Sequence, residues 1–349
     1  MSAVPVAIDA PPALLEVEDL VTQYPIPRGI LGTIQRRPRL TVHAVDGVSF
    51  SVGEGEMVAL VGESGCGKTS TAQTVIRMVE SNSGSIRFRG TELAGLGTRD
   101  LRPFRREIQI IYQDPYESLD PRFTVRDTIE EPIRVHGLTD SSSAREAKVH
   151  EAMERAGLTP PELFIDRFPH ELSGGQRQRV AIAAALVLEP RLLIADEPVS
   201  MLDVSVRAGI LALLDSLRRD GMGVLMITHD LSTAAHFADR IAVMYLGRIV
   251  EEGPARDVVR NPQHPYTKAL ISVVPRRDPD QQTTPQILKG ETPNPVHVPS
   301  GCRFHPRCPV AVERCREVDP ELRGVAGVAA EHRAACILLE DAVPEPATG

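Results

Sequence analysis

The sequence predicts an α/β fold in which helices cover a mainly parallel β-sheet. From residue 173 to residue 245 the chain alternates helical patterns with short apolar runs, which is typical of parallel strands joined by helices. Upstream, an apolar run at 57–61 leads through a glycine-rich turn into a helical pattern that begins at Lys68. This second observation indicates a strand, a phosphate-binding loop and a helix in succession.

The individual elements follow from the hydrophobic pattern. A first strand is predicted over 14–21, and the Pro-, Gly- and Arg-containing segment 25–39 is predicted to be an inserted loop. Helical periodicity covers 124–157 and restarts after a Ser-rich cap. The later predictions are a helix over 173–188, a strand over 192–195, a helix over 204–219, a strand over 223–227, a helix over 231–237, a strand over 241–245, and a hairpin at 246–248 leading into 249–252.

Composition excludes several classes of protein. The chain has 349 residues and a formal net charge of −8, and is long enough for one large domain with an appendage. Net acidity and the absence of tryptophan argue against a nucleic-acid partner. The longest strongly apolar run, 180–188, is about half of what crosses a bilayer. The start of the chain lacks a signal-peptide pattern, so we expect a cytosolic protein.

Residues 62–69 fit the phosphate-loop pattern G-x-x-x-x-G-K-[ST]. Glycines let backbone N–H groups converge on phosphate oxygens, and the following helix N-terminus adds positive potential. Lys68 would neutralise the terminal phosphates, and Thr69 would supply a Mg²⁺ ligand. An ordinary glycine turn would not need a strand before it and a helix after it. The predicted nucleotide-binding residues here are Gly62, Glu63, Ser64, Gly65, Cys66, Gly67, Lys68, Thr69 and Ser70.

A second pattern is the apolar strand that ends in Asp196 and Glu197. A carboxylate at the end of a strand beside a phosphate loop can hold Mg²⁺, and its neighbour can polarise an attacking water. Taken alone, the pair is as compatible with the acidic first turn of a helix.

The string at 172–176, Leu-Ser-Gly-Gly-Gln, resembles the signature of the ABC transporter ATPase family. Over roughly residues 13–273 the motifs of that family occur in its order: the phosphate loop, Gln113, the signature, Asp196-Glu197, Asp203 and His229. The resemblance implies a P-loop NTPase core with a mainly parallel sheet, an antiparallel β subdomain and a helical subdomain at about 115–172. Residues 1–12 are then expected to be a loose tract, and 274–349 a C-terminal extension.

The resemblance also implies a role for each catalytic residue. Glu197 would be the general base, and His229 would contact the γ-phosphate of ATP. Gln113 would sense metal and water and link the site to membrane subunits. Asp196 would bind Mg²⁺ together with Thr69 and Gln113.

In the family, the signature of one subunit caps ATP held by another, so two ATPase domains form composite sites. The residues with this implied role are Ser173, Gly174, Gly175 and Gln176, and Asp203 would lie at the dimer seam. Tyr24 is the candidate for the aromatic ring stacked on adenine, and a plain core tyrosine is the alternative.

Short sequence segments indicate which branch of the family the chain resembles. Residues 113–122, 169–171 and 264–270 resemble segments of oligopeptide and dipeptide importer ATPases. Glu171 and the Cys66-containing loop resemble the second of the two ATPase subunits of such importers. The implied protein hydrolyses ATP at the cytoplasmic face of the membrane to power import. Its implied partners are a second ATPase subunit in a heterodimer, two transmembrane permease subunits and an extracytoplasmic solute-binding protein. An importer for nickel or sugars, or a soluble non-transport ABC ATPase, is the alternative.

Four of the five cysteines, Cys302, Cys308, Cys315 and Cys336, lie in the predicted extension. Clustered thiols in a cytosolic chain fit ligation of an iron–sulfur cluster or zinc better than disulfides. Similar patterns in the extensions of peptide-importer ATPases are associated with a [4Fe–4S] cluster. Zinc, and unligated buried thiols, are the alternatives.

Overall fold

The fold is described from a computed structural model, which covers residues 13–28, 40–116, 118–273, 286–288, 290–325, 327–329 and 331–340. The predicted loose tract 1–12 lies outside the described residues, as does most of the inserted loop predicted over 25–39.

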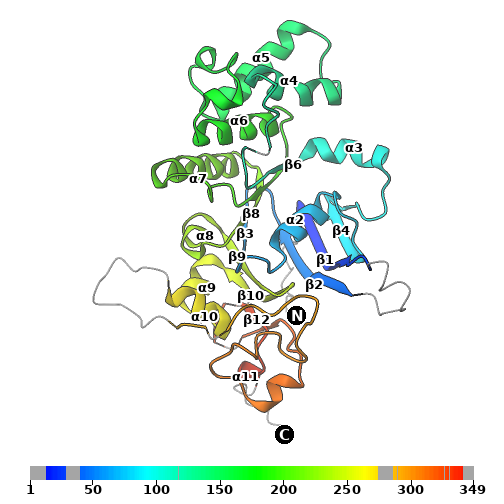
Figure 1. Cartoon of the computed structure of the whole chain (residues 1–349), viewed down its shortest axis with the longest axis vertical. Coiled ribbons are helices and arrows are strands. Elements are labelled where there is room, and N and C mark those ends of the chain that lie inside the picture. The colour runs from blue at the N-terminus through cyan, green and yellow to red at the C-terminus, as the bar shows by residue number, and fades with distance from the viewer. Residues whose placement is uncertain are drawn as a thin grey trace, which may run out of the picture.

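The main sheet has eight strands in the order β11-β12-β10-β9-β3-β8-β7-β6 (Figure 1). Its five strands from β9 to β6 run parallel, whereas β10, β12 and β11 continue the sheet in antiparallel pairing. The strands are β3 (Met57–Val61), β6 (Ile108–Ile111), β7 (Leu192–Asp196), β8 (Gly223–Thr228), β9 (Arg240–Tyr245), β10 (Arg248–Pro254), β11 (Arg323–Gly324) and β12 (Arg333–Ala334).

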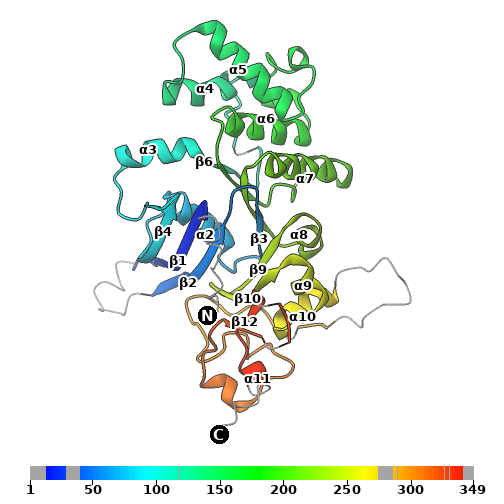
Figure 2. The same ribbon diagram turned by 180° about the vertical axis from the view of Figure 1, so that it is seen from behind.

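A second, antiparallel sheet has the strand order β2-β1-β4-β5. It lies beside helix α2 in both views (Figures 1 and 2), and matches the antiparallel β subdomain that the resemblance implies. Its strands are β1 (Leu15–Pro25), β2 (Thr41–Val52), β4 (Ser83–Phe88) and β5 (Thr91–Glu92).

Helices cover the main sheet and extend the molecule at one end, where α4, α5 and α6 lie far from α11 (Figures 1 and 2). The helices are α2 (Lys68–Val75), α3 (Thr98–Glu107), α4 (Val125–His136), α5 (Ser142–Arg155), α6 (Gly174–Leu186), α7 (Val204–Arg219), α8 (Leu231–Phe237), α9 (Ala255–Arg260), α10 (Pro265–Ser272) and α11 (Ile337–Glu340). Short 3₁₀ turns cover Pro161–Leu163, Pro169–Glu171 and Glu313–Arg316.

The central strands are buried on both faces, which is why they read as continuous apolar runs. Successive side chains of β3 point to opposite faces: Met57, Ala59 and Val61 join the core under the helices, whereas Val58 and Leu60 join a second core with α2 and the antiparallel sheet. The phosphate loop therefore follows a strand that is packed on both faces.

The C-terminal extension shares the core of the rest of the chain. Its strand β12 pairs with β10, and the N–H of Ala335 donates to the carbonyl of Val250. The ring of Phe304 is 1% exposed and lies 5.2 Å from Tyr245 and 5.4 Å from Tyr266, centroid to centroid. The extension thus gains from the main domain the apolar burial that its own Pro- and Gly-rich sequence does not supply.

The structure confirms the predicted α/β fold and most predicted elements. Helices α7 and α8 have the predicted bounds, and the first strand extends beyond 14–21 to Pro25. The pattern does not reveal α3, because this helix buries only Leu101 and contains Pro103. The four-residue strand β6 is also too short to leave a pattern. Within the described residues, no helix is long and apolar enough to span a bilayer.

Candidate functional site

Parallel pairing brings three strand ends to one edge of the main sheet. Val61 on β3 is paired with Thr228 on β8, and Asp196 on β7 is paired with Ile227 of the same strand. The segments that leave these strands begin at Gly62, His229 and Glu197. Ligands of open α/β sheets bind at this carboxyl edge, so the predicted motifs meet where a nucleotide would be expected.

At two positions of the phosphate loop only glycine fits, because the backbone of neighbouring strands lies too close for a Cβ atom. A Cβ on Gly62 would lie 2.2 Å from the carbonyl oxygen of Met244, and one on Gly67 would lie 2.0 Å from that of Ala44. Gly67 also has φ +109°, which side-chain-bearing residues rarely adopt. Any larger residue would push the loop away from the strands that support it.

Lys68 starts α2 and is only 5% exposed. Its Nζ donates to the carbonyls of Gly62 at 2.8 Å and Glu63 at 3.0 Å. The ammonium group is thus held within the loop and aimed at the space where phosphate oxygens would sit. Cys66 is buried beside it, and burial raises the pKa of the Cys66 thiol.

Gln113, Glu197 and His229 converge although they are far apart in sequence. The Oε2 atom of Glu197 lies 3.1 Å from Nε2 of Gln113 and 3.2 Å from Nδ1 of His229. Glu197 has φ +46°, a conformation that is costly for a residue with a side chain and often marks functional sites. A carboxylate with two polar partners and an open face can orient and deprotonate a water molecule.

Asp196 ends β7 and is 2% exposed. Thr69 donates a hydrogen bond to it, but its buried Oδ1 atom has no partner among the described residues. Burial raises the pKa of Asp196, and the charge of Glu197 adds to this effect while Thr69 and Lys68 oppose it. An unpaired buried carboxylate oxygen next to a threonine hydroxyl is the donor set that Mg²⁺ prefers.

One cleft of about 680 Å³, a size typical of small-molecule sites, is lined by most of the predicted nucleotide-site residues but not by Gly62, Cys66 or Asp196. Tyr24 lines it, as the adenine-stacking proposal requires, together with predicted residues Glu63, Ser64, Gly65, Gly67, Lys68, Thr69, Ser70, Gln113, Glu197 and His229. Four further lining residues carry no motif that predicted them: Val42, Ala44, Leu270 and Pro295. Leu270 belongs to the noted string 264–270, but no motif spacing marks Pro295.

The signature residues do not line this cleft. Ser173 caps α6, where its Oγ accepts from the N–H of Gln176, and the Gln176 side chain accepts from the N–H of Ser173 in return. Gly175 packs so closely on α7 that a Cβ would lie 2.4 Å from Val206. The signature is a rigid helix N-terminus, suited to an anion, and Ser173 is exposed.

Asp203 also lies outside the cleft. It precedes α7 without a side-chain capping bond and is exposed. The adjacent apolar side chains of Met201 and Val204 are 60% and 80% exposed, which is a feature of surfaces that another protein covers.

The four C-terminal cysteines line one small pocket with His264 and Phe304. They are Cys302, Cys308, Cys315 and Cys336, all unpaired. Burial raises the pKa of Cys302 to about 11, and the neighbouring thiols add to this effect. Among the described residues, no group of three or more His, Cys, Asp or Glu side chains stands in metal-ligating geometry. The thiols are therefore gathered in one place without forming a closed coordination shell.

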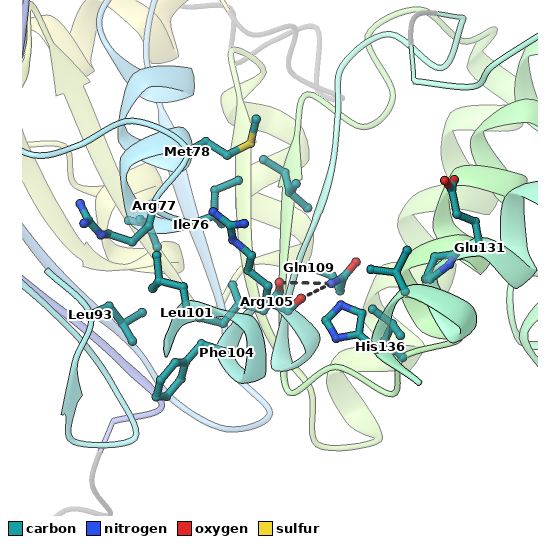
Figure 3. Close-up of a pocket in the computed structure, with 16 residues that line it drawn as sticks. Ile76, Arg77, Met78, Leu93, Leu101, Phe104, Arg105, Gln109, Glu131 and His136 are labelled. Carbon is teal, nitrogen blue, oxygen red and sulfur yellow. Dashed lines mark hydrogen bonds between the residues drawn. The ribbon is translucent and has the colours of Figure 1, made fainter. Parts of the chain in front are cut away.

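A second cavity, of about 620 Å³, lies between the core and α4. In Figure 3, Met78 and Leu101 face this groove from the core side, and Glu131 and His136 face it from α4. Met78 and Val135 are 60% and 56% exposed at its rim. Its lining includes β6, the strand that leads to Gln113.

Two family models match the sequence. Residues 45–200 match the family described as "ABC transporter", and residues 250–315 match "Oligopeptide/dipeptide transporter, C-terminal region". The chain is 48% identical to the "Putative oligopeptide transport ATP-binding protein YkfD" of Bacillus subtilis (strain 168), over 82% of this chain and 87% of that protein. It is 44% identical to the "Oligopeptide transport ATP-binding protein OppF" of Escherichia coli (strain K12), over 94% of this chain and 96% of that protein.

Solved structures with the same fold are ATP-binding cassettes. The dimeric, post-hydrolysis structure of the cassette MJ0796 bound to ADP and Pi has a TM-score of 0.60 and 27% identity, and covers 69% of this chain and 99% of that chain. The cbiO1 subunit of an ABC transporter from Clostridium perfringens has a TM-score of 0.59 and 28% identity, over 71% of this chain and 91% of that chain.

Asp196→Asn should raise the melting temperature of the nucleotide-free protein by a few degrees at pH 7, because folding then no longer buries a charge. The gain should shrink as pH falls through the raised pKa of Asp196, since protonation removes the same charge from the wild type. Thermal melts at several pH values, with and without Mg²⁺ and ADP, measure both effects. A variant that melts below wild type at pH 7 would contradict the interpretation of Asp196 as a buried carboxylate with one unpaired oxygen.

Proposed function

The chain belongs to the ABC transporter family of ATP-binding proteins, and on this premise we propose that it hydrolyses ATP to power an importer of oligopeptides or dipeptides. One observation supports the hydrolytic role above the others: Gln113 and His229 converge on Glu197 in the cleft that holds the phosphate loop. The match of residues 250–315 to the oligopeptide/dipeptide C-terminal region supports the substrate class.

In the proposed hydrolysis of ATP, each residue of the cleft has one role. Lys68 neutralises the terminal phosphates, and Glu197 accepts a proton from the attacking water. Gln113 and His229 hold the Glu197 carboxylate and close the γ-phosphate side of the cleft. Thr69 and Asp196 fit as Mg²⁺ ligands because a buried Asp196 oxygen has no hydrogen-bond partner within the described part of the chain. When bound, the metal offsets charge on the phosphates.

Glu197→Gln should retain ATP binding and lower turnover by about 10²–10⁴-fold, because the amide cannot accept the proton. ATPase and peptide-uptake assays of the complex in proteoliposomes measure the loss, and ATP binding to the purified chain measures what remains. Glu154→Gln, an exposed change on α5, is the control. Near-normal turnover by Glu197→Gln would refute the assignment, and uptake of nickel or sugar instead of peptide would correct the substrate.

A complete site in this proposal needs a second ATPase subunit, in a heterodimer. The signature from Ser173 to Gln176 is preorganised for an anion yet does not line the cleft of its own chain. Exposed Met201 and Val204 flank Asp203, so these three residues are the proposed dimer seam. The signature then covers ATP bound to the partner.

Ser173→Arg should leave ATP binding to this chain intact and lower the ATPase activity of the assembled complex about tenfold or more, because the bulky side chain blocks the partner's site and removes a hydrogen-bond donor. Binding to the isolated chain and activity of the complex are the two measurements. Ser143→Arg, at an exposed serine on α5, controls for the added charge. Full activity of a strictly monomeric wild-type chain would contradict the composite site.

The groove between the core and α4 is the proposed contact for the transmembrane permease subunits. Its apolar rim is exposed at Met78 and Val135, and its β6 lining leads to Gln113. A permease segment in the groove would therefore reach the hydrolytic cluster through one short strand. In this role the chain works at the cytoplasmic face of the membrane, with an extracytoplasmic solute-binding protein delivering the substrate.

Val135→Glu should abolish assembly with the permease subunits and leave ATP binding by the isolated chain unchanged, because it places a charge in an apolar contact. Co-purification from detergent-solubilised membranes measures assembly. Leu163→Glu is a matched control, since Leu163 is 55% exposed and Val135 is 56% exposed. Assembly unaffected by Val135→Glu would show that the permeases bind elsewhere.

The four clustered cysteines are proposed to hold a [4Fe–4S] cluster, with zinc as the alternative. Their donor set fits: Cys302, Cys308, Cys315 and Cys336 line one pocket that contains no carboxylate, and thiolates are the ligands of such clusters. A bound cluster would stabilise an extension with little apolar core of its own.

Protein purified without oxygen should contain about four iron atoms and four acid-labile sulfides per chain. Cys308→Ser should lose most of this iron. Cys66→Ser is the matched control and should retain it, because Cys66 lies in the phosphate loop instead of the pocket. Stoichiometric zinc would favour the alternative, and protein without either metal would end the proposal.

A further inference from the structure

The segment from Cys302 to Cys308 contains two arginines whose side chains pair with carboxylates of the ATPase core. The side chain of Arg303 is 9% exposed and that of Arg307 is 8% exposed; arginines so deeply buried are normally paired. Arg307 pairs with Glu63, the second residue of the phosphate loop. Two thiols of the cysteine pocket are therefore joined by a short segment to a contact with the nucleotide-binding loop.

Glu63 is held at three points by residues from the C-terminal part of the chain. Arg307 donates to both carboxylate oxygens, at 2.7 and 3.1 Å. Thr292 Oγ1 donates to Oε2 at 2.6 Å, and the backbone N–H of Glu63 donates to the hydroxyl of Tyr266 at 2.9 Å. Burial opposes the charge, yet the bonds from Arg307 and Thr292 hold the pKa of Glu63 below its usual range.

The same residue also holds the phosphate-binding lysine, because the carbonyl of Glu63 accepts from Nζ of Lys68 at 3.0 Å. A displacement of Arg307 would leave a partly buried carboxylate without its cation, and Glu63 would move toward water. Its carbonyl and its N–H would move with it. The geometry of the loop around Lys68 thus depends on a residue about 240 positions away in the chain.

The segment itself has little freedom to absorb such a displacement. Phe304 anchors its middle in the aromatic cluster with Tyr245 and Tyr266. At the other end, the N–H of Cys302 donates to the carbonyl of Cys315. Because Phe304 fixes the middle of the segment, a displacement of Cys308 falls on its neighbour Arg307.

We propose that Arg307 is a positioning residue for the phosphate loop, and that through it the state of the cysteine pocket sets the affinity of the chain for nucleotide. This inference rests on the proposed role of residues 62–70 in binding ATP.

Arg303 provides a matched comparison within the same segment. It is as buried as Arg307 and also pairs with a carboxylate, Asp46, but this partner lies on β2 instead of in the phosphate loop. It further donates to the carbonyl of Leu246. Loss of either arginine should loosen the extension to a similar degree, whereas only loss of Arg307 removes a direct contact with Glu63.

The first experiment measures binding of Mg²⁺-ADP to the full-length chain by calorimetry, so that turnover does not interfere. Arg307→Ala should raise the Kd about fivefold to tenfold, the range expected from one charge-assisted contact, and Arg307→Lys should recover part of it. Arg303→Ala should change the Kd by less than about twofold, although it should lower the melting temperature as much as Arg307→Ala does. The double variant Glu63→Gln/Arg307→Ala should have a Kd for Mg²⁺-ADP no higher than that of either single variant.

The second experiment asks whether the thiols act through Arg307. Cys308→Ser should weaken ADP binding in the wild-type background and have no further effect in Arg307→Ala, because the connection is already broken. Circular dichroism confirms that each variant is folded. Equal effects of Cys308→Ser in both backgrounds would overturn the coupling.

The controls separate this inference from the proposed function. If Lys68→Ala binds ADP as well as the wild type, the proposed nucleotide site is wrong. If Lys68→Ala loses binding but Arg307→Ala retains wild-type affinity, the site stands and the positioning role of Arg307 is wrong. If Arg303→Ala weakens binding as much as Arg307→Ala, the effect is general loosening of the extension, which also overturns the inference.

Discussion

The parallel pairing of β3, β8 and β7 is the constraint on which the rest of the site depends. Their register places Val61, Thr228 and Asp196 at one edge, so the residues that follow must share one cleft. The contacts of Glu197 with Gln113 and His229 are possible only because of this alignment. A sheet buried on both faces holds the alignment firmly, because a slip of one residue would turn apolar side chains toward the wrong layer.

The same architecture separates the signature from the cleft that the phosphate loop lines. The signature lies at the start of α6, and Asp203 lies just before α7; neither contributes to the cleft of its own chain. Both are presented outward on rigid helix N-termini. In the proposed composite site, this arrangement would make hydrolysis conditional on a partner subunit.

The C-terminal extension is integrated into the ATPase core. Its strands extend the main sheet, its residue Phe304 enters the main core, and Arg307 reaches the phosphate loop. This integration explains how a Pro- and Gly-rich segment with little apolar content is ordered. It also places the four clustered thiols a short segment away from the phosphate loop, because Cys308 is next to Arg307.

The sequence by itself determined the α/β class, the strand–loop–helix unit at 57–75 and the motif residues, because strict spacing and hydrophobic periodicity are local properties of the chain. It did not determine β6 or α3, whose short or charged sequences are ordered by tertiary packing. Through the family resemblance, the motifs also implied that Gln113, Glu197 and His229 serve one site and that the signature serves the site of another subunit. The contacts themselves, of Glu197 with Gln113 and of Arg307 with Glu63, follow from long-range packing, which no local pattern encodes.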